Sequence, residues 1–164
     1  MKARNWVIAG SMVVITVLSY SLYAGSRDSQ PRFPEEYRDW PFAKAKLIPP
    51  AAPGTGGFRH HYANRKAARS WGTGIFDEGS VIVDERVESV MNANGVWVEG
   101  KVLHVAVMKK DSHRYADTGG WGFNIFMGDD RTVGLTPEQA RASCFEPCHK
   151  SQIDRDFVFS DYRR

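Results

Sequence analysis

Six consecutive residues near the C-terminus carry the most specific chemistry in this sequence: Cys144-Phe145-Glu146-Pro147-Cys148-His149. In the usual haem c attachment motif, C-x-x-C-H, two thiols add to the porphyrin vinyl groups and the adjacent imidazole binds iron. This chain has one more residue between the cysteines. Residues three and four apart lie on one side of a helical turn, so the longer spacing still presents both sulfurs to one porphyrin edge. The motif predicts one covalently bound haem c, tethered through Cys144 and Cys148, with iron held by His149.

Two alternatives for the cysteines stay open at this point. An oxidising compartment would allow a plain disulfide between Cys144 and Cys148. A zinc site is a weaker alternative, because two thiols and one imidazole leave ligands missing and the sequence has no second cysteine pair. The alternative for several other side chains is ordinary packing or solvation. The candidates for a sixth iron ligand are His60, His61, His104, His113, Met108 and Met127.

The first 24 residues indicate export. Lys2 and Arg4 precede an apolar, uncharged run from Trp6 to Ala24. A run of roughly 18 to 20 apolar residues can span a bilayer, whereas cleaved signals have cores of about 7 to 15. Residues 1–25 are therefore expected to be an inner-membrane anchor or a cleaved signal, residues 26–32 a tether, and residues 33–164 a periplasmic domain.

Composition limits the remaining classes. A chain of 164 residues suits one compact domain, and 42% hydrophobic with 25% charged residues is typical of a globular protein. The net charge of +3 is small and spread along the chain. It predicts no nucleic-acid partner.

Strand signals dominate the elements that must position the motif. β-Branched and aromatic residues predict strands over 58–62, 80–90, 96–109 and 121–127, and the Asn-Gly pair within 92–95 predicts a hairpin. Helices are expected over 33–40, over 63–71, and from Thr136 onward, where Thr136, Pro137 and Gln139 form a capping box. The proline- and glycine-rich stretch 41–57 is expected to be a surface loop. The fold class is α+β, mainly an antiparallel sheet with a few helices and the haem-binding helix near the C-terminus.

Landmarks across the exported part resemble one known family. They occur in family order: residues 34–40 (P-E-E-Y-R-D-W), Phe58-Arg59, Phe76, Gly79 to Glu85, Lys110-Asp111-Ser112, Arg114-Tyr115, Gly120 to Phe123, Thr136 into the cysteine motif, and Asp156 to Phe159. On these residues the chain resembles the cytochrome P-460 and cytochrome c′-beta family of β-sheet haem proteins. The resemblance implies a proximal His149 and a distal side left open for a small ligand.

Two positions distinguish the branches of that family. The hydroxylamine-oxidising branch has a lysine crosslinked to the porphyrin and a distal carboxylate, and these positions match Asp84 and Ala106 here. Aspartate cannot form that crosslink, and alanine supplies no group for proton transfer. The distal pocket is expected to include Arg59, Phe58, Phe76, Asp84 and Ala106, with no catalytic residue assigned.

The sequence thus favours a five-coordinate haem that binds nitric oxide or a related nitrogen oxide. Two rival functions stay open: an oxidoreductase acting on hydroxylamine or nitric oxide, and an electron-transfer cytochrome. Each of these three functions implies a redox partner protein. The resemblance implies a possible homodimer through the sheet.

Overall fold

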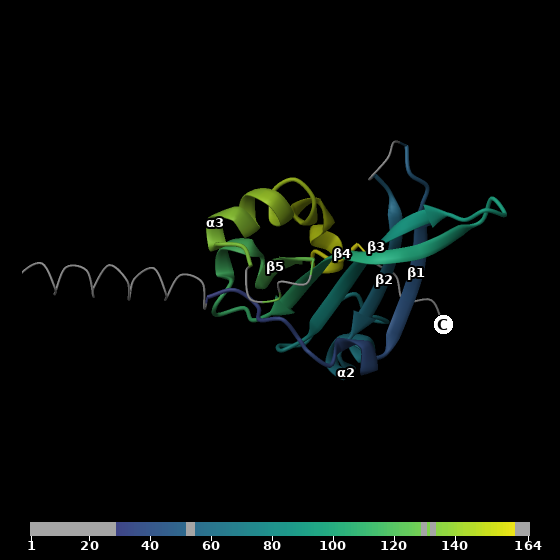
Figure 1. Ribbon diagram of the computed structural model, residues 1–164. Helices are drawn as coiled ribbons and strands as arrows, with labels where there is room; N and C mark the ends of the chain where they lie inside the picture. The colour runs from purple at the N-terminus through teal and green to yellow at the C-terminus, as the bar shows by residue number, and fades with distance from the viewer. Residues whose placement is uncertain (1–28, 52–54, 129–130, 132–133, 160–164) are drawn as a thin grey trace, which may run out of the picture.

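The fold is a single five-stranded antiparallel sheet with its strands in chain order, as Figure 1 shows for the computed structural model. The structure describes residues 29–51, 55–128, 131 and 134–159. The strands are β1 (Phe42–Ile48), β2 (Gly57–Ala63), β3 (Val81–Met91), β4 (Trp97–Lys110) and β5 (Trp121–Met127). The prediction of a mainly antiparallel α+β fold with few helices is confirmed.

The first strand corrects the expected loop over 41–57. Phe42–Ile48 forms β1 and pairs with β2 through most of its length. Prolines stand directly before and after this segment, and they gave it the composition of a loop. It is tolerated as a strand because prolines at the ends of an edge strand remove no central ladder hydrogen bond. Its charged side chains Lys44 and Lys46 are typical of an edge strand.

The hairpin between β3 and β4 forms as predicted. Asn92 Oδ1 accepts hydrogen bonds from the backbone N–H groups of Asn94 at 2.9 Å and Val96 at 3.0 Å. Gly95 has φ of 73°, a left-handed conformation that glycine adopts without a steric penalty. The hairpin extends well beyond the other strands (Figure 1).

The helices are shorter than the sequence suggested. The structure has α2 (Arg65–Ser70), capped by the Asn64 side chain, because Ala63 before it belongs to β2. The expected helix over 33–40 is only a 3-10 turn, Tyr37–Asp39, and a second such turn spans Ala116–Thr118. Within the described residues, none of the helices is long and apolar enough to cross a membrane. The proposed anchor over 1–25 lies outside the described residues.

The sheet has a hydrophobic core on each face because side chains alternate along a strand. One core holds Ile82, Met108 and Phe123 beneath the C-terminal segment. The other holds Val83, Val105 and Phe126 under the segment around Tyr37.

The residues just before the domain pack against it rather than standing free. Gln30 and Pro31 are buried, and Asn124 Nδ2 on β5 donates a 2.8 Å hydrogen bond to the Pro31 carbonyl. The described part of the expected tether over 26–32 therefore belongs to the packed structure.

Candidate functional site

The capping box at Thr136 begins the segment that delivers the cysteines. Thr136 Oγ1 accepts from the Gln139 backbone N–H at 3.3 Å, and Gln139 Oε1 accepts from the Thr136 backbone N–H at 2.9 Å. This α-helix, α3, spans only Pro137–Ala140 and is followed by a π-helical turn, Arg141–Phe145. Single π turns within helices often occur at functional sites.

The π turn contains Cys144 and leads into the residues between the two cysteines. The Glu146 N–H bonds to the Arg141 carbonyl at 3.0 Å, five residues back, so this turn holds more residues than an α turn. After a further turn, Cys148 and His149 begin a 3-10 segment, His149–Arg155. Cys144, Cys148 and His149 all line one cavity. The predicted helix near the C-terminus is present over 137–145, and the backbone changes its helical period within it.

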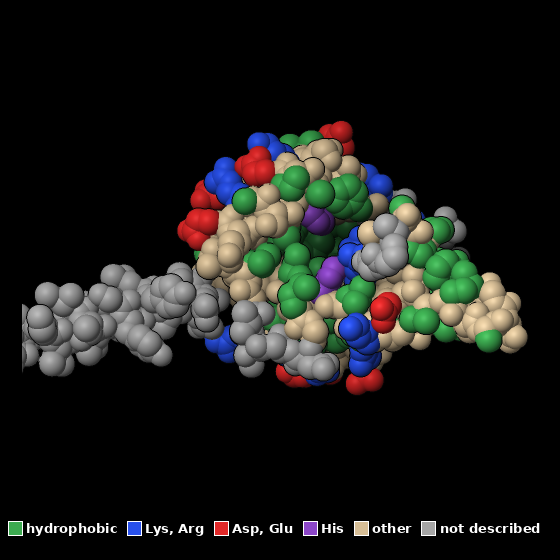
Figure 2. All heavy atoms as spheres, turned by 45° about the horizontal axis from the view of Figure 1, so that its top comes forward, with side chains coloured by type: hydrophobic (Ala, Val, Ile, Leu, Met, Phe, Trp, Pro, Cys, Tyr) green, Lys and Arg blue, Asp and Glu red, His purple; other side chains and the backbone are tan. Residues whose placement is uncertain are grey.

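That cavity of about 590 Å³ lies between the C-terminal segment and one face of the sheet. Figure 2 shows it as a hollow with an apolar floor and histidine side chains at its edges. Residues from all five strands contribute to its wall. The strand residues lining it are Lys44, Lys46, Ile48, Arg59, His61, Ile82, Asp84, His104, Ala106, Val107, Met108, Phe123, Asn124 and Ile125.

The environment of His149 fixes the tautomer of its ring. Nδ1 lies 2.7 Å from the Phe157 carbonyl oxygen, so the proton resides on Nδ1 and Nε2 carries the lone pair. The ring packs against Phe123 at 4.7 Å and Phe159 at 5.0 Å between centroids. Burial lowers the pKa of His149, although the bond to Phe157 and the charge of Asp84 oppose that shift. A neutral imidazole with Nε2 available is the form that binds iron.

The two cysteines are free thiols in the structure. Burial, with a smaller contribution from Cys148, raises the pKa of Cys144 to about 11. Cys148 is exposed at the cavity rim. Within the described residues, no cluster of three or more histidine, cysteine or acidic side chains could hold a metal ion.

The sheet register places the two branch-distinguishing positions side by side. Asp84 pairs with Ala106 across β3 and β4, and both line the cavity. Asp84 is engaged by Arg59, whose Nη2 lies 2.9 Å from Oδ2 and whose Nε donates to Oδ1 at 3.2 Å. Arg59 and Asp84 thus neutralise each other on the wall.

Two histidines of this wall were predicted from the sequence only as single candidates for a sixth iron ligand. His61 pairs with Asp84 across β2 and β3, with Nε2 3.8 Å from Oδ2, and His104 lies two residues before Ala106. Burial lowers the pKa of both His61 and His104, and the charge of Asp84 opposes the shift. Side chains two residues apart on a strand, and cross-strand partners, share one face of the sheet. With the register known, Asp84 and Ala106 would therefore have placed His61 and His104 on the cavity wall.

Other expected site residues lie elsewhere. Phe58 neighbours Arg59 on β2, so its side chain faces away from the cavity. Phe76 packs in the core between Trp71 and Trp121, at 5.8 and 5.5 Å. Neither residue lines the cavity, so these two predictions were wrong. They rested on aromatic type, which does not specify the face of a sheet.

The remaining ligand candidates divide in the same way. Met108 lines the cavity, whereas Met127 is exposed. His60 lies on the opposite face beside Glu85, with Nδ1 3.5 Å from Oε2, and His113 is exposed.

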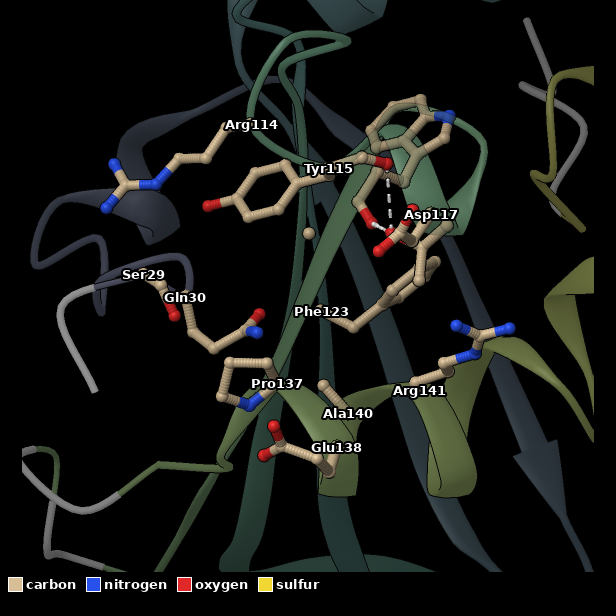
Figure 3. Close-up of a pocket in the computed structure, with 13 residues that line it drawn as sticks. Ser29, Gln30, Arg114, Tyr115, Asp117, Phe123, Pro137, Glu138, Ala140 and Arg141 are labelled. Atoms are coloured by element: carbon tan, nitrogen blue, oxygen red, sulfur yellow. Dashed lines mark hydrogen bonds between the residues drawn. The ribbon is translucent and has the colours of Figure 1, made fainter. Parts of the chain in front are cut away.

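A second, smaller cavity of about 300 Å³ shares one residue with the first. Figure 3 shows it between Gln30, Tyr115, Pro137 and Ala140, with Phe123 at its side. Phe123 therefore separates this cavity from the one that contains His149.

An antiparallel sheet with a cysteine pair and an adjacent histidine on one cavity is the arrangement that a β-sheet haem protein requires. Comparison with protein families agrees: the model of the family Cytochrome P460 matches residues 34–160. The chain belongs to this family, which implies a haem cofactor. A search of curated proteins found no match.

Proposed function

We propose that this protein is a periplasmic single-haem c-type cytochrome that binds small nitrogen oxides, nitric oxide above all, at an open iron position. The observation that carries the proposal is the convergence of Cys144, Cys148 and His149 on one cavity whose opposite wall has alanine and aspartate at the two oxidase positions. The segment 1–25 would anchor the domain to the inner membrane or direct its secretion.

The cavity residues fit a haem. Two free thiols and an imidazole with Nε2 available supply the attachment and the axial ligand. A bound haem would supply an iron able to take a small ligand, with His149 as the residue that would hold that iron. The chain contributes orientation, because the Phe157 carbonyl fixes the His149 tautomer.

Apolar side chains on the sheet wall favour an uncharged ligand. Ile82, Ala106, Met108 and Ile125 offer no hydrogen-bond donor, and the nearby charges of Arg59 and Asp84 are paired. These four positions admit a diatomic molecule and give no hydrogen bond to activated oxygen, so the polar groups of the wall that remain to be tested are His61 and His104.

Hydroxylamine oxidation is disfavoured by the same wall. A carboxylate paired with Arg59 stands at the crosslink position, and Ala106 beside it cannot accept a proton. His61 and His104 are titratable groups of this cavity, so oxidation remains the enzymatic rival. Electron transfer would require a sixth ligand or a haem edge exposed to a docking surface, and the ligand candidates that line the cavity are His61, His104 and Met108.

Optical spectra of the protein expressed with cytochrome maturation machinery separate these functions. A five-coordinate ferrous spectrum whose Soret band shifts with nitric oxide supports the proposal. The red-shifted absorption of crosslinked relatives would establish the oxidase instead, and a six-coordinate, ligand-inert spectrum would establish the carrier.

Two variant pairs sharpen the comparison. His149→Ala should abolish the wild-type axial coordination, whereas His113→Ala, at an exposed position, should not alter the spectrum. If the spectrum is six-coordinate, one of the substitutions Met108→Leu, His61→Ala and His104→Ala should make it five-coordinate, whereas Met127→Leu should not. A colourless protein with the mass of the bare polypeptide would refute the haem assignment altogether.

A further inference from the structure

Two consecutive residues of the C-terminal segment have left-handed backbones although neither is glycine. Asp156 has φ of 48° and Phe157 has φ of 62°. Such conformations cost on the order of 1–3 kcal/mol each, and aspartate tolerates them better than a bulky aromatic residue. Contacts elsewhere in the structure must therefore hold this turn.

The Asp156 carboxylate supplies those contacts. Oδ1 accepts hydrogen bonds from Lys110 Nζ at 2.5 Å and Trp121 Nε1 at 3.3 Å, and Oδ2 accepts from the Phe76 backbone N–H at 2.9 Å. The side chains of Asp156 and Lys110 are only 13% and 11% exposed. Lys110 and Trp121 are cross-strand partners on β4 and β5, so the carboxylate ties the turn to the sheet.

The turn is also held from the side of the Phe157 ring. Gly119 leaves the space that this ring occupies, since a Cβ there would lie 2.2 Å from a Phe157 ring carbon. With both residues in place, the Phe157 carbonyl oxygen lies 2.7 Å from His149 Nδ1. One chain of contacts therefore runs from Lys110 through Asp156 and the Phe157 backbone to His149.

We propose that Asp156, paired with Lys110, is a positioning residue for the proximal iron ligand. It holds the left-handed turn that aims the Phe157 carbonyl at His149 Nδ1. This inference rests on His149 being the haem ligand, as proposed above. A hydrogen bond donated by Nδ1 makes Nε2 a stronger electron-pair donor to the iron. This stabilises ferric over ferrous iron and lowers the reduction potential.

A purely structural role is the competing explanation, and the variants must separate the two. Asp156→Asn keeps the shape and the tolerance of a left-handed backbone, but it leaves the buried Lys110 ammonium without its counter-ion. Lys110→Met combined with Asp156→Asn removes both charges, which is often close to neutral for folding. Neither variant changes a residue that lines the haem cavity.

Glu85 offers a matched control on the other face of the sheet. Its buried carboxylate accepts a 2.6 Å hydrogen bond from the Tyr37 hydroxyl and pairs with Arg38, with no contact to the C-terminal segment among its described interactions. Glu85→Gln should lower stability as Asp156→Asn does, because each substitution removes a buried, hydrogen-bonded charge.

The readouts are the iron–histidine stretching frequency of the ferrous protein, measured by resonance Raman, the midpoint reduction potential, and urea unfolding. Asp156→Asn and the double variant should lower the frequency and raise the potential, while Glu85→Gln should change neither. An unchanged frequency in Asp156→Asn, at a loss of stability equal to that of Glu85→Gln, would overturn the proposal.

If Asp156→Asn does not fold, an unchanged iron–histidine frequency in the folded double variant would overturn the proposal. Neither result depends on nitric oxide, whose binding is tested separately by the Soret shift of the unsubstituted protein.

Discussion

Replacing Ala106 with glutamate tests the placement of the cavity wall directly. Ala106 and Asp84 are cross-strand partners on one face of β3 and β4, so the introduced carboxyl would stand beside an existing carboxylate. Directly opposite like charges destabilise an antiparallel pair. The matched control is Ala106→Gln, which has nearly the same shape and no charge.

The size of the effect follows from the register. Cross-strand Cβ atoms are about 5 Å apart, and two unit charges at that separation repel by about 3 kcal/mol at an effective dielectric constant near 20. Arg59, 2.9 Å from Asp84, offsets part of this, and the 23% exposure of the Asp84 side chain adds solvent screening. The net penalty of Ala106→Glu relative to Ala106→Gln should be roughly 1–2 kcal/mol at pH 8.

The penalty should also depend on pH, with a definite sign. Repulsion raises the folded-state pKa of the introduced carboxyl above its unfolded value of about 4.3. The penalty is therefore absent below that value and appears as the pH rises through the raised folded-state pKa.

Urea unfolding of both variants at pH 4 and pH 8 measures the penalty. Equal stability of the glutamate and glutamine variants at both pH values would show that residues 84 and 106 do not adjoin. In the haem-loaded protein, Ala106→Glu should also increase any hydroxylamine turnover.

Three further predictions concern the rest of the structure. Tyr37→Phe loses the 2.6 Å hydrogen bond to the buried Glu85 carboxylate and should lower the free energy of unfolding by about 1.5–3 kcal/mol in urea titrations; no change would mean that the bond does not form. Burial lowers the folded-state pKa of His61 and of His104 below the unfolded value of about 6.5. Their contribution to stability is therefore complete above about pH 6.5 and is lost as the pH falls toward the folded-state pKa values. NMR titration should locate both folded-state pKa values below about 6.5. In the haem-free chain, iodoacetamide at pH 8 should alkylate the exposed Cys148 well before Cys144, whose pKa is raised to about 11; equal rates by mass spectrometry would contradict the burial of Cys144.

Much of the local structure could be predicted because it depends on neighbouring residues. The capping box at Thr136 and the Asn-Gly hairpin turn formed as expected, since their hydrogen bonds join residues only a few positions apart. The four predicted strands also formed, each end within one residue of its predicted position. The motif at 144–149 indicated the chemistry for the same reason, as its three functional side chains are close in sequence.

Features that depend on distant partners could not be predicted in this way. The segment 42–48 became a strand because β2 supplies its hydrogen bonds, and proline on both sides hid that pairing from composition. The same limit applied to Phe58, whose face follows from the register and not from its aromatic type.

The sequence alone supplied the prediction of the site, because residue type and spacing are those of thiol attachment with an adjacent imidazole. Only the tertiary structure decided what surrounds it. Strand register set Asp84 beside Ala106 and His61, and a turn held by Lys110 and Asp156 brought a carbonyl to His149. These contacts join residues far apart in the chain, so they exist only once the sheet has closed over the C-terminal segment.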